Sequence, residues 1–168
     1  MKKQKISAKT VALLAMMIAL ALVFSYVETL IPINFGIPGV KLGLANLVIV
    51  AALYLIGGKE AFLVSVVRIF LSGFMFGNLF SILYSLAGAA LSLTVMELLK
   101  KHSGFSLIGI SVAGGVTHNI GQLIVAMIVV SNTSLMVYAP ALLVAGVLAG
   151  ILIGWLTKEV VGRLPLNL

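Results

Sequence analysis

The sequence contains no cysteine and very little charge. Among its 168 residues none is Cys, and only 9% are Asp, Glu, Lys or Arg. The absence of Cys excludes a disulfide framework, a thiolate zinc site, an iron–sulfur cluster and a cysteine nucleophile. The scarcity of charge excludes a soluble globular domain, because so few charged residues cannot solvate the surface of a chain of this length.

Hydrophobic residues dominate the chain instead, at 62% of the sequence, with a mean hydropathy of +1.26. Apolar runs of about 20 residues cross a bilayer as helices, because a helix satisfies its own backbone hydrogen bonds in hydrocarbon. We therefore expect an all-α integral membrane protein with a single transmembrane domain over residues 1–168. Gly, Pro and Lys residues divide it into about six spans: 8–31, 42–56, 60–76, 79–99, 105–130 and 135–161.

The basic residues mark the ends of these runs and predict the orientation of the chain. The net charge is +7, and cytoplasmic loops of membrane proteins carry an excess of Lys and Arg. A cytoplasmic amino terminus places every basic residue on the inner side except Lys41, which lies outside, and Arg68, which lies within a span. We therefore expect a protein of the plasma membrane with both termini in the cytoplasm. Because the basic residues punctuate apolar runs, nucleic acid is not an expected partner.

Arg68 lies near the middle of the third predicted span. A charge at the centre of a bilayer costs about 3 kcal/mol or more unless a partner or water compensates it. Ser65 and Ser72 share its helical face, which favours an orientation toward the interior of the protein. Two roles fit Arg68: a structural clamp that satisfies helix-end carbonyls, and a ligand for the anionic group of a substrate.

Residues 114–122 form the most polar stretch inside any predicted span. His118 lies near mid-membrane with Asn119 and Gln122 close by, and such side chains either bond neighbouring helices or mark a binding site. Both roles are open for His118, while Asn119 and Gln122 favour a site. The sequence has no His-Glu-x-x-His or other metal-binding spacing, so we expect neither a metal nor a cofactor.

Further polar residues gather toward the outer ends of the spans and predict a substrate cavity open to the outside. The two positive charges of Lys41 and Arg68 outweigh the single negative charge of Glu28. This balance favours a ligand with phosphate or carboxylate groups. Glu28 has an alternative place in the headgroup region, where helix ends tolerate charge. The residues that we add to Arg68, His118, Asn119 and Gln122 as candidate substrate ligands are Glu28, Lys41, Asn46, Asn78 and Tyr84.

Small residues at helical spacing predict where helices approach closely, because helices in a bilayer associate through backbone proximity. A ladder of Gly146, Gly150 and Gly154 in the last span is interpreted as internal packing. The first span carries a second set, here called the alanine face, for which internal packing and docking of a separate protein are both open. The alanine face consists of Ala8, Ala12, Ala15 and Ala19.

Five ordered motifs spread over most of the chain carry a family resemblance. They are Ser-Tyr-Val-Glu at 25–28, Gly-Ile-Pro-Gly-Val-Lys-Leu-Gly-Leu-Ala-Asn at 36–46, Arg68 followed by Ser-Gly-Phe-Met-Phe-Gly at 72–77, Leu-Tyr-Ser-Leu-Ala-Gly at 83–88, and Ser-Val-Ala-Gly-Gly-Val-Thr-His-Asn at 111–119. With these motifs the chain resembles the Gx transporter family, whose members are also labelled heptaprenyl diphosphate synthase component I.

That family is similar to the substrate-binding S subunits of energy-coupling-factor transporters. The resemblance implies a six-helix bundle, an outward-facing pocket for a vitamin or metabolite, and toppling within the bilayer to deliver the ligand. In those subunits an Ala-x-x-x-Ala pattern on the first helix docks a transmembrane scaffold subunit, and the alanine face matches this pattern. Some relatives are linked to prenyl-quinone metabolism or to flavin-based extracellular electron transfer.

The sequence therefore predicts a substrate-binding transport subunit for a small anionic metabolite or vitamin-like compound, not an enzyme. It has no Gly-x-x-x-x-Gly-Lys phosphate loop, so a separate ATPase would have to energise uptake. Prenyl chain elongation is not expected, because the chain has no Asp-rich diphosphate–magnesium motif and no Asp at all. Two alternatives stay open: a membrane accessory protein of isoprenoid or quinone metabolism, in which Arg68 and His118 hold a lipid diphosphate, and a subunit of a membrane redox complex.

Overall fold

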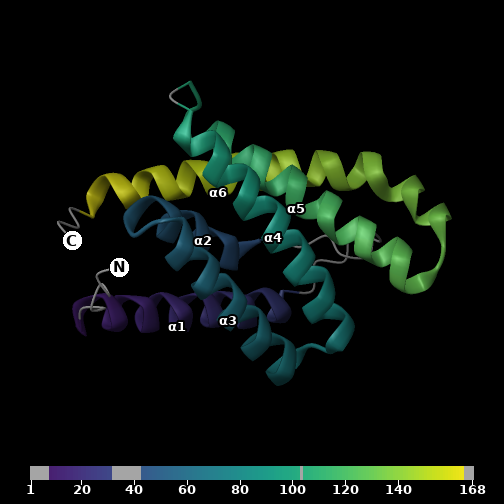
Figure 1. Ribbon diagram of the computed structural model, residues 1–168, viewed down its shortest axis with the longest axis horizontal. Coiled ribbons are helices and arrows are strands. Elements are labelled where there is room, and N and C mark those ends of the chain that lie inside the picture. The colour runs from purple at the N-terminus through teal and green to yellow at the C-terminus, as the bar shows by residue number, and fades with distance from the viewer. Residues whose placement is uncertain (1–7, 32–42, 103, 165–168) are drawn as a thin grey trace, which may run out of the picture.

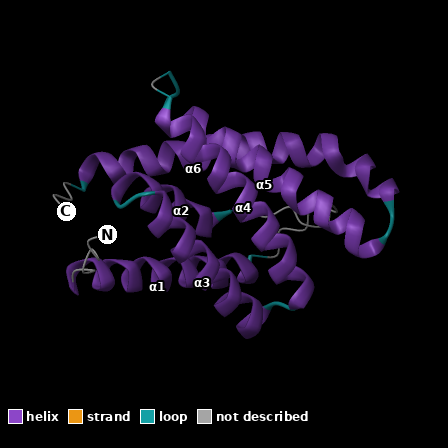
Figure 2. Ribbon diagram, viewed as in Figure 1, coloured by secondary structure: helices purple, strands orange, loops and turns teal. Residues whose placement is uncertain are grey.

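The computed structural model describes residues 8–31, 43–102 and 104–164, and every regular element in these ranges is a helix (Figures 1 and 2). The start of α1 and the end of α6 lie at the same end of the bundle (Figure 1). The predicted all-α helical bundle is thus confirmed. In chain order its elements are α1 (Ala8–Leu30), α2 (Leu44–Leu55), α3 (Gly58–Phe76), α4 (Leu79–Lys101), α5 (Leu107–Val130), the 3-10 helix η1 (Thr133–Tyr138) and α6 (Ala139–Arg163).

Four helical segments of the described ranges are long and apolar enough to cross a membrane: α1, α4, α5, and η1 together with α6. The chain is therefore a helical membrane protein. The third predicted span forms α3, whose 19 residues include Lys59, Glu60 and Arg68 and are correspondingly less apolar. The α-helical part of the last predicted span begins only at Ala139, because residues 133–138 wind as a 3-10 helix before Pro140 in the first turn of α6.

The second predicted span becomes the short helix α2. Its 12 residues reach about 18 Å at 1.5 Å per residue, well short of a hydrocarbon core of about 30 Å. The start of α2 lies deep in the bundle, because a Cβ on Gly43 would be 3.1 Å from Cδ1 of Ile153, a residue past the middle of α6. Helix α2 thus occupies only part of the membrane thickness.

Short polar signals set several helix boundaries. Asn78 caps α4 by accepting a hydrogen bond from the Ser81 backbone N–H at 2.8 Å, while the Ser81 hydroxyl accepts one from the Asn78 N–H at 3.0 Å. This reciprocal pair is a capping box, which satisfies donors that a helix start leaves free. Ser106 caps α5 with a single bond, because its hydroxyl accepts a hydrogen bond from the Gly109 N–H at 3.1 Å. Gly57, with φ of 127°, makes the turn between α2 and α3.

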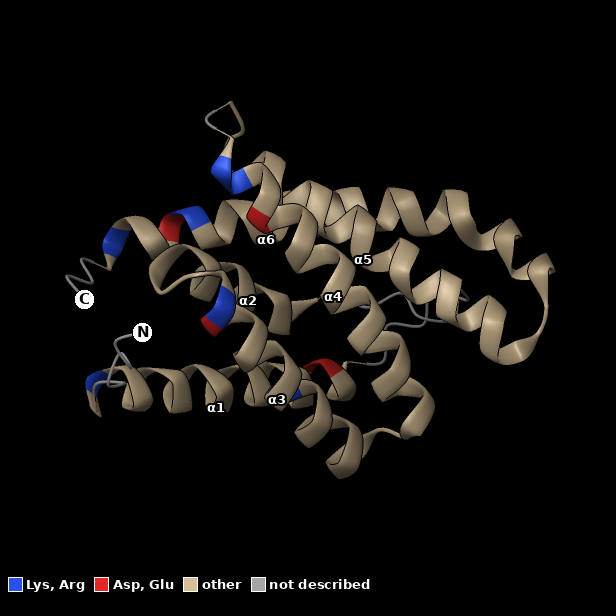
Figure 3. Ribbon diagram, viewed as in Figure 1, with Lys and Arg blue, Asp and Glu red and all other residues tan. Residues whose placement is uncertain are grey.

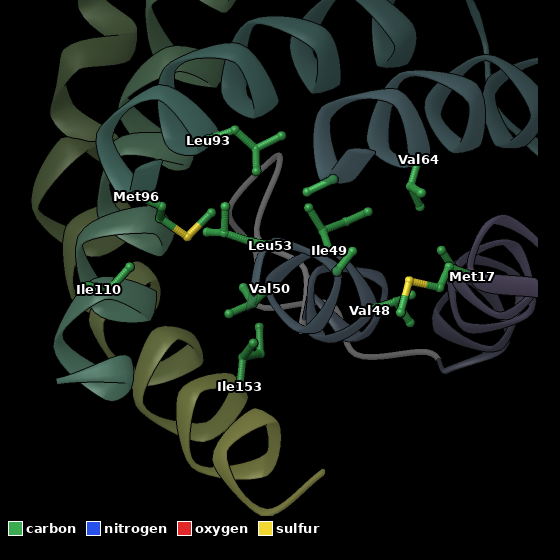
Figure 4. Packing of buried hydrophobic residues seen from close by; sticks show 13 residues of the cluster. Met17, Val48, Ile49, Val50, Leu53, Val64, Leu93, Met96, Ile110 and Ile153 are labelled. Carbon is green, nitrogen blue, oxygen red and sulfur yellow. The ribbon is translucent and has the colours of Figure 1, made fainter. Parts of the chain in front are cut away.

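The core of the bundle is built around α2. Seven of its 12 residues are buried, and Ile49, Val50 and Leu53 point toward side chains from the surrounding helices (Figure 4). Those neighbours come from all of the remaining α-helices, so α2 connects the helices that surround it. The labelled contributors are Met17 of α1, Val64 of α3, Leu93 and Met96 of α4, Ile110 of α5 and Ile153 of α6.

A lysine from α4 holds the carboxyl end of α2. Lys100 Nζ donates a hydrogen bond to the Leu53 carbonyl oxygen at 2.6 Å and lies 5.1 Å from the centroid of the Tyr54 ring. The last carbonyls of a helix lack partners within the helix and carry partial negative charge, so a cation is favourable there. About one helical turn before Lys100 on α4, the Glu97 carboxylate packs against Gly58 at the start of α3.

Helices α5 and α6 pack with their backbones in contact. A Cβ on Gly150 would lie 2.5 Å from the Val112 Cα, and one on Gly146 would lie 2.9 Å from the Gly115 carbonyl oxygen. Gly154 approaches the Ile108 Cα to a similar degree. The glycine ladder of the last span is therefore an internal helix–helix contact, as the sequence predicted.

This contact predicts a large cost for one added methyl group. We expect Gly150→Ala to lower the unfolding free energy by about 2 kcal/mol, because the clash is with backbone that cannot rotate away. Gly162→Ala on the same helix is the matched control, since a Cβ there meets nothing within 4 Å. Thermal unfolding of the two variants in detergent measures the difference. Equal melting temperatures would contradict the close α5–α6 contact.

Many charged residues of the described ranges lie toward the end of the bundle that carries the start of α1 and the end of α6 (Figure 3), whereas Glu28 lies near the opposite end of α1. This distribution fits a bundle with one basic, cytoplasmic end. We predict that a cysteine at Gly104, in the exposed α4–α5 turn, is protected from an impermeant thiol reagent added to intact cells. A cysteine at Thr133, exposed at the other end, should be labelled. Labelling of the Gly104→Cys variant alone would show that the protein has the opposite orientation in the membrane.

Candidate functional site

A cavity of about 340 Å³ lies inside the bundle, at the amino-terminal end of α2. It extends from Thr29 near the end of α1 and Gly77 after α3 to Met96 near the inner end of α4. Gly43, Asn46 and Ile49 line it from the start of α2. The cavity therefore lies where the short α2 leaves space between the longer helices.

Hydroxyl groups are the commonest polar groups of the lining. Several of these hydroxyls already bond their own helix: Ser25 Oγ donates to the Ala21 carbonyl at 2.9 Å and Ser72 Oγ to that of Ile69 at 3.2 Å. A hydroxyl that donates in this way still has lone pairs that can accept hydrogen bonds. The hydroxyl residues of the lining are Ser25, Thr29, Ser65, Ser72, Ser81, Ser85, Ser92 and Ser111.

The charged groups of the described lining are one cation and one anion, Arg68 and Glu28. Arg68 Nε is buried and has no hydrogen-bond partner among the described residues. Glu28 lines the same cavity as Arg68, but the ion pairs within the described part of the chain are Lys101–Glu97 and Arg163–Glu159. Arg68 is thus a cation of the cavity lining that forms no ion pair among the described residues and whose Nε donor is unused.

Glu28 makes its direct contact with the backbone. Its Oε1 accepts a hydrogen bond from the N–H of Gly43, the residue that caps α2. Gly43 has φ of 77°, a conformation that glycine adopts without strain. The Glu28 side chain therefore turns toward the start of α2 and lines the cavity.

The polar segment of α5 faces the cavity with three side chains, His118, Asn119 and Gln122. His118 packs against α4, because a Cβ on Gly88 would lie 2.9 Å from its Nε2 atom. Asn119 Nδ2 donates a hydrogen bond to the Leu142 carbonyl at 2.7 Å and so connects α5 to α6. Asn119 therefore has a structural bond in addition to its place in the lining.

Six of the nine side chains predicted as substrate ligands line one cavity: Glu28, Asn46, Arg68, His118, Asn119 and Gln122. Asn78 is not among the lining residues, because its side chain is occupied as the cap of α4. Tyr84 is also absent from the lining, although the neighbouring Ser85 is present. Lys41 lies outside the described residues.

The sequence prediction missed two contributors to the cavity. The hydroxyls of Ser81, Ser85 and Ser92 share one face of α4 by their spacing, which is a signal that could have placed them in the site. The second contributor is the amino terminus of α2 at Gly43. Its signal was the short length of the second apolar run, because a helix too short to span a bilayer must begin or end inside it.

The alanine face lies on the outside of the bundle. Ala8, Ala12, Ala15 and Ala19 are all exposed, whereas the buried side of α1 carries Met17, Ala21 and Ser25. At 100° per residue the two sets lie on roughly opposite sides of the helix. Internal packing of the alanine face is thus excluded within the described residues.

A known protein family matches most of the chain. The model of the family described as heptaprenyl diphosphate synthase component I matches residues 17–160. The chain belongs to this family. No curated protein and no solved structure was found to match the chain.

Proposed function

We propose that this protein is a membrane-embedded substrate-binding subunit for uptake of a small anionic metabolite or vitamin-like compound. The observation that carries the proposal is Arg68, a cation at mid-membrane whose buried Nε has no partner among the described residues and which lines a cavity. A clamp would place the guanidinium on helix-end carbonyls. A guanidinium with free donors is suited to bidentate contact with carboxylate or phosphate.

The other cavity residues have supporting roles in this proposal. His118 and Gln122 are the hydrogen-bonding groups that face the same cavity from α5. The hydroxyls of α3 and α4 and the amide of Asn46 complete the polar lining, among glycine and aliphatic residues. A concave cavity that combines apolar walls with convergent polar groups is typical of small-molecule sites. Nothing in this set requires a catalytic step, so we propose binding and not catalysis.

The alanine face is the proposed docking surface for an energising complex in the plasma membrane. Methyl side chains let another helix approach the α1 backbone closely, and the face is exposed along the first half of α1. The proposed partners are a transmembrane scaffold subunit and its ATPases, because the chain has no phosphate-binding loop of its own.

The family description favours a second candidate function, an accessory role in prenyl diphosphate metabolism. In that case Arg68 and His118 would hold the diphosphate of an isoprenoid lipid in the same cavity. Copurified proteins separate the two functions: ATPases support the transport subunit and a prenyltransferase supports the accessory role. Native mass spectrometry of the purified protein would identify a retained small molecule directly.

The anion site predicts a selective effect of Arg68→Lys. We expect binding of the molecule identified by mass spectrometry to weaken by about 2 kcal/mol, the scale of a charged hydrogen bond, because lysine keeps the charge but loses the planar fork. The melting temperature of the empty protein should change little. Isothermal titration calorimetry and thermal unfolding measure the two quantities.

The matched control is Arg163→Lys, at the exposed end of α6, which should alter neither quantity. If Arg68→Lys instead unfolds the empty protein while any folded fraction binds normally, Arg68 is a clamp and the site assignment is wrong.

The docking surface predicts that Ala12→Trp abolishes association with the energising complex, because the indole holds a partner helix away from α1. Ligand binding in detergent should stay nearly unchanged. Leu20→Trp is the control, since Leu20 is also exposed on α1 but lies about 80° away from Ala12 around the helix. Copurification from membranes measures association. Loss of both association and ligand binding in the Ala12→Trp variant would contradict a pure docking role.

A further inference from the structure

The Glu28 carboxylate occupies the amino terminus of α2. The cap residue of α2 is Gly43, which has no side chain, and no side chain from within the helix caps it. Glu28 of α1 supplies the missing acceptor by bonding the Gly43 N–H. The first N–H groups of a helix carry partial positive charge, so a carboxylate is favourable in this position.

Arg68 is the second positive group near this carboxylate. Glu28 forms no ion pair with it among the described residues, and the buried Nε of Arg68 has no hydrogen-bond partner there. Gly43, Glu28 and Arg68 all line the same cavity. The Glu28 carboxylate therefore shares one cavity with two positive groups, a helix terminus that it bonds and a guanidinium whose Nε donor is unused.

We propose that Glu28 is an internal counter-ion that the anionic group of the ligand displaces from the amino terminus of α2, in the cavity that Arg68 also lines. This inference rests on the anion site proposed above. It assigns the ligand class as an oxyanion able to bond a helix amino terminus and a guanidinium together. Phosphate and diphosphate groups suit this arrangement, because their several oxygens can accept from both donors at once.

An internal counter-ion that the ligand displaces has two consequences, one for the empty protein and one for binding. The empty cavity is held near charge neutrality, which lowers the cost of keeping Arg68 inside the membrane. Ligand affinity is reduced, because each binding event must first break the Glu28–Gly43 bond and place two anions near one another. A zwitterionic ligand would reverse the role of Glu28, which would then contact the cationic group of the ligand and strengthen binding.

The sign of the effect of Glu28→Gln on affinity decides between these roles. The probe is inorganic pyrophosphate, titrated into detergent-solubilised protein by calorimetry. We expect Glu28→Gln to bind pyrophosphate at least tenfold more tightly than the unchanged protein. Glu159→Gln, which removes the same charge at the exposed end of α6, is the matched control and should leave affinity unchanged. Unchanged or weaker binding by Glu28→Gln would overturn the displacement.

A second variant covers the case in which Glu28→Gln does not fold with Arg68 uncompensated. Glu28→Asp keeps the charge but shortens the side chain by one methylene, which should weaken the bond to Gly43. We expect a gain in pyrophosphate affinity of about threefold, consistent with weakening one hydrogen bond to a charged group. Equal or lower affinity in Glu28→Asp would also overturn the displacement.

The ligand source is tested with a second probe, dihexanoyl phosphatidic acid, which presents phosphate as a lipid headgroup. Binding of both probes, or of pyrophosphate alone, keeps a soluble metabolite as the ligand. Binding of the lipid alone, strengthened by Glu28→Gln, keeps the displacement but overturns uptake of a soluble metabolite. If Arg68→Lys weakens binding while Glu28→Gln does not strengthen it, only the displacement fails. If neither probe binds any variant, the oxyanion site and the displacement both fail.

Discussion

The charge of Arg68 is the constraint on which the interior of this bundle depends. A guanidinium at mid-membrane costs about 3 kcal/mol or more unless its surroundings compensate it. Here the compensation comes from Glu28 of α1 and from a lining rich in hydroxyl groups. The same polar surroundings that stabilise the cation form the walls of the cavity. Stability of the empty protein and the proposed recognition of an anion would thus depend on one set of side chains.

Two kinds of helix packing make room for this site. On one side, α5 and α6 pack with backbones in contact through Gly146, Gly150 and Gly154, and no space is left between them. On the other side, α2 is too short to fill the bundle from one membrane surface to the other. The glycine contacts fix a rigid wall that carries His118 and Gln122. The short helix then leaves the space that this wall faces.

The fold was largely predictable from the sequence, because apolar runs in a bilayer have few alternatives to helices. Helix ends, the internal role of the glycine ladder and the lining position of Arg68, His118 and Gln122 also followed from spacing and polarity. The inward turn of Glu28 did not, because it depends on how deep α2 begins, and depth is set by packing against α6. Asn78 was misplaced for a local reason: an amide at a helix start serves as a cap as readily as a ligand.

Helix α2 is held at its two ends by charged side chains from different helices. Glu28 of α1 bonds the Gly43 N–H at its amino end, and Lys100 of α4 bonds the Leu53 carbonyl at its carboxyl end. Both contacts complement the helix dipole, negative charge at the amino end and positive charge at the carboxyl end. A ligand anion that replaces Glu28 preserves this electrostatic arrangement while breaking the bond between α1 and α2. Lys100 keeps the other end of α2 bonded to α4, so occupancy of the cavity changes how α2 is attached to α1, the helix that carries the alanine face.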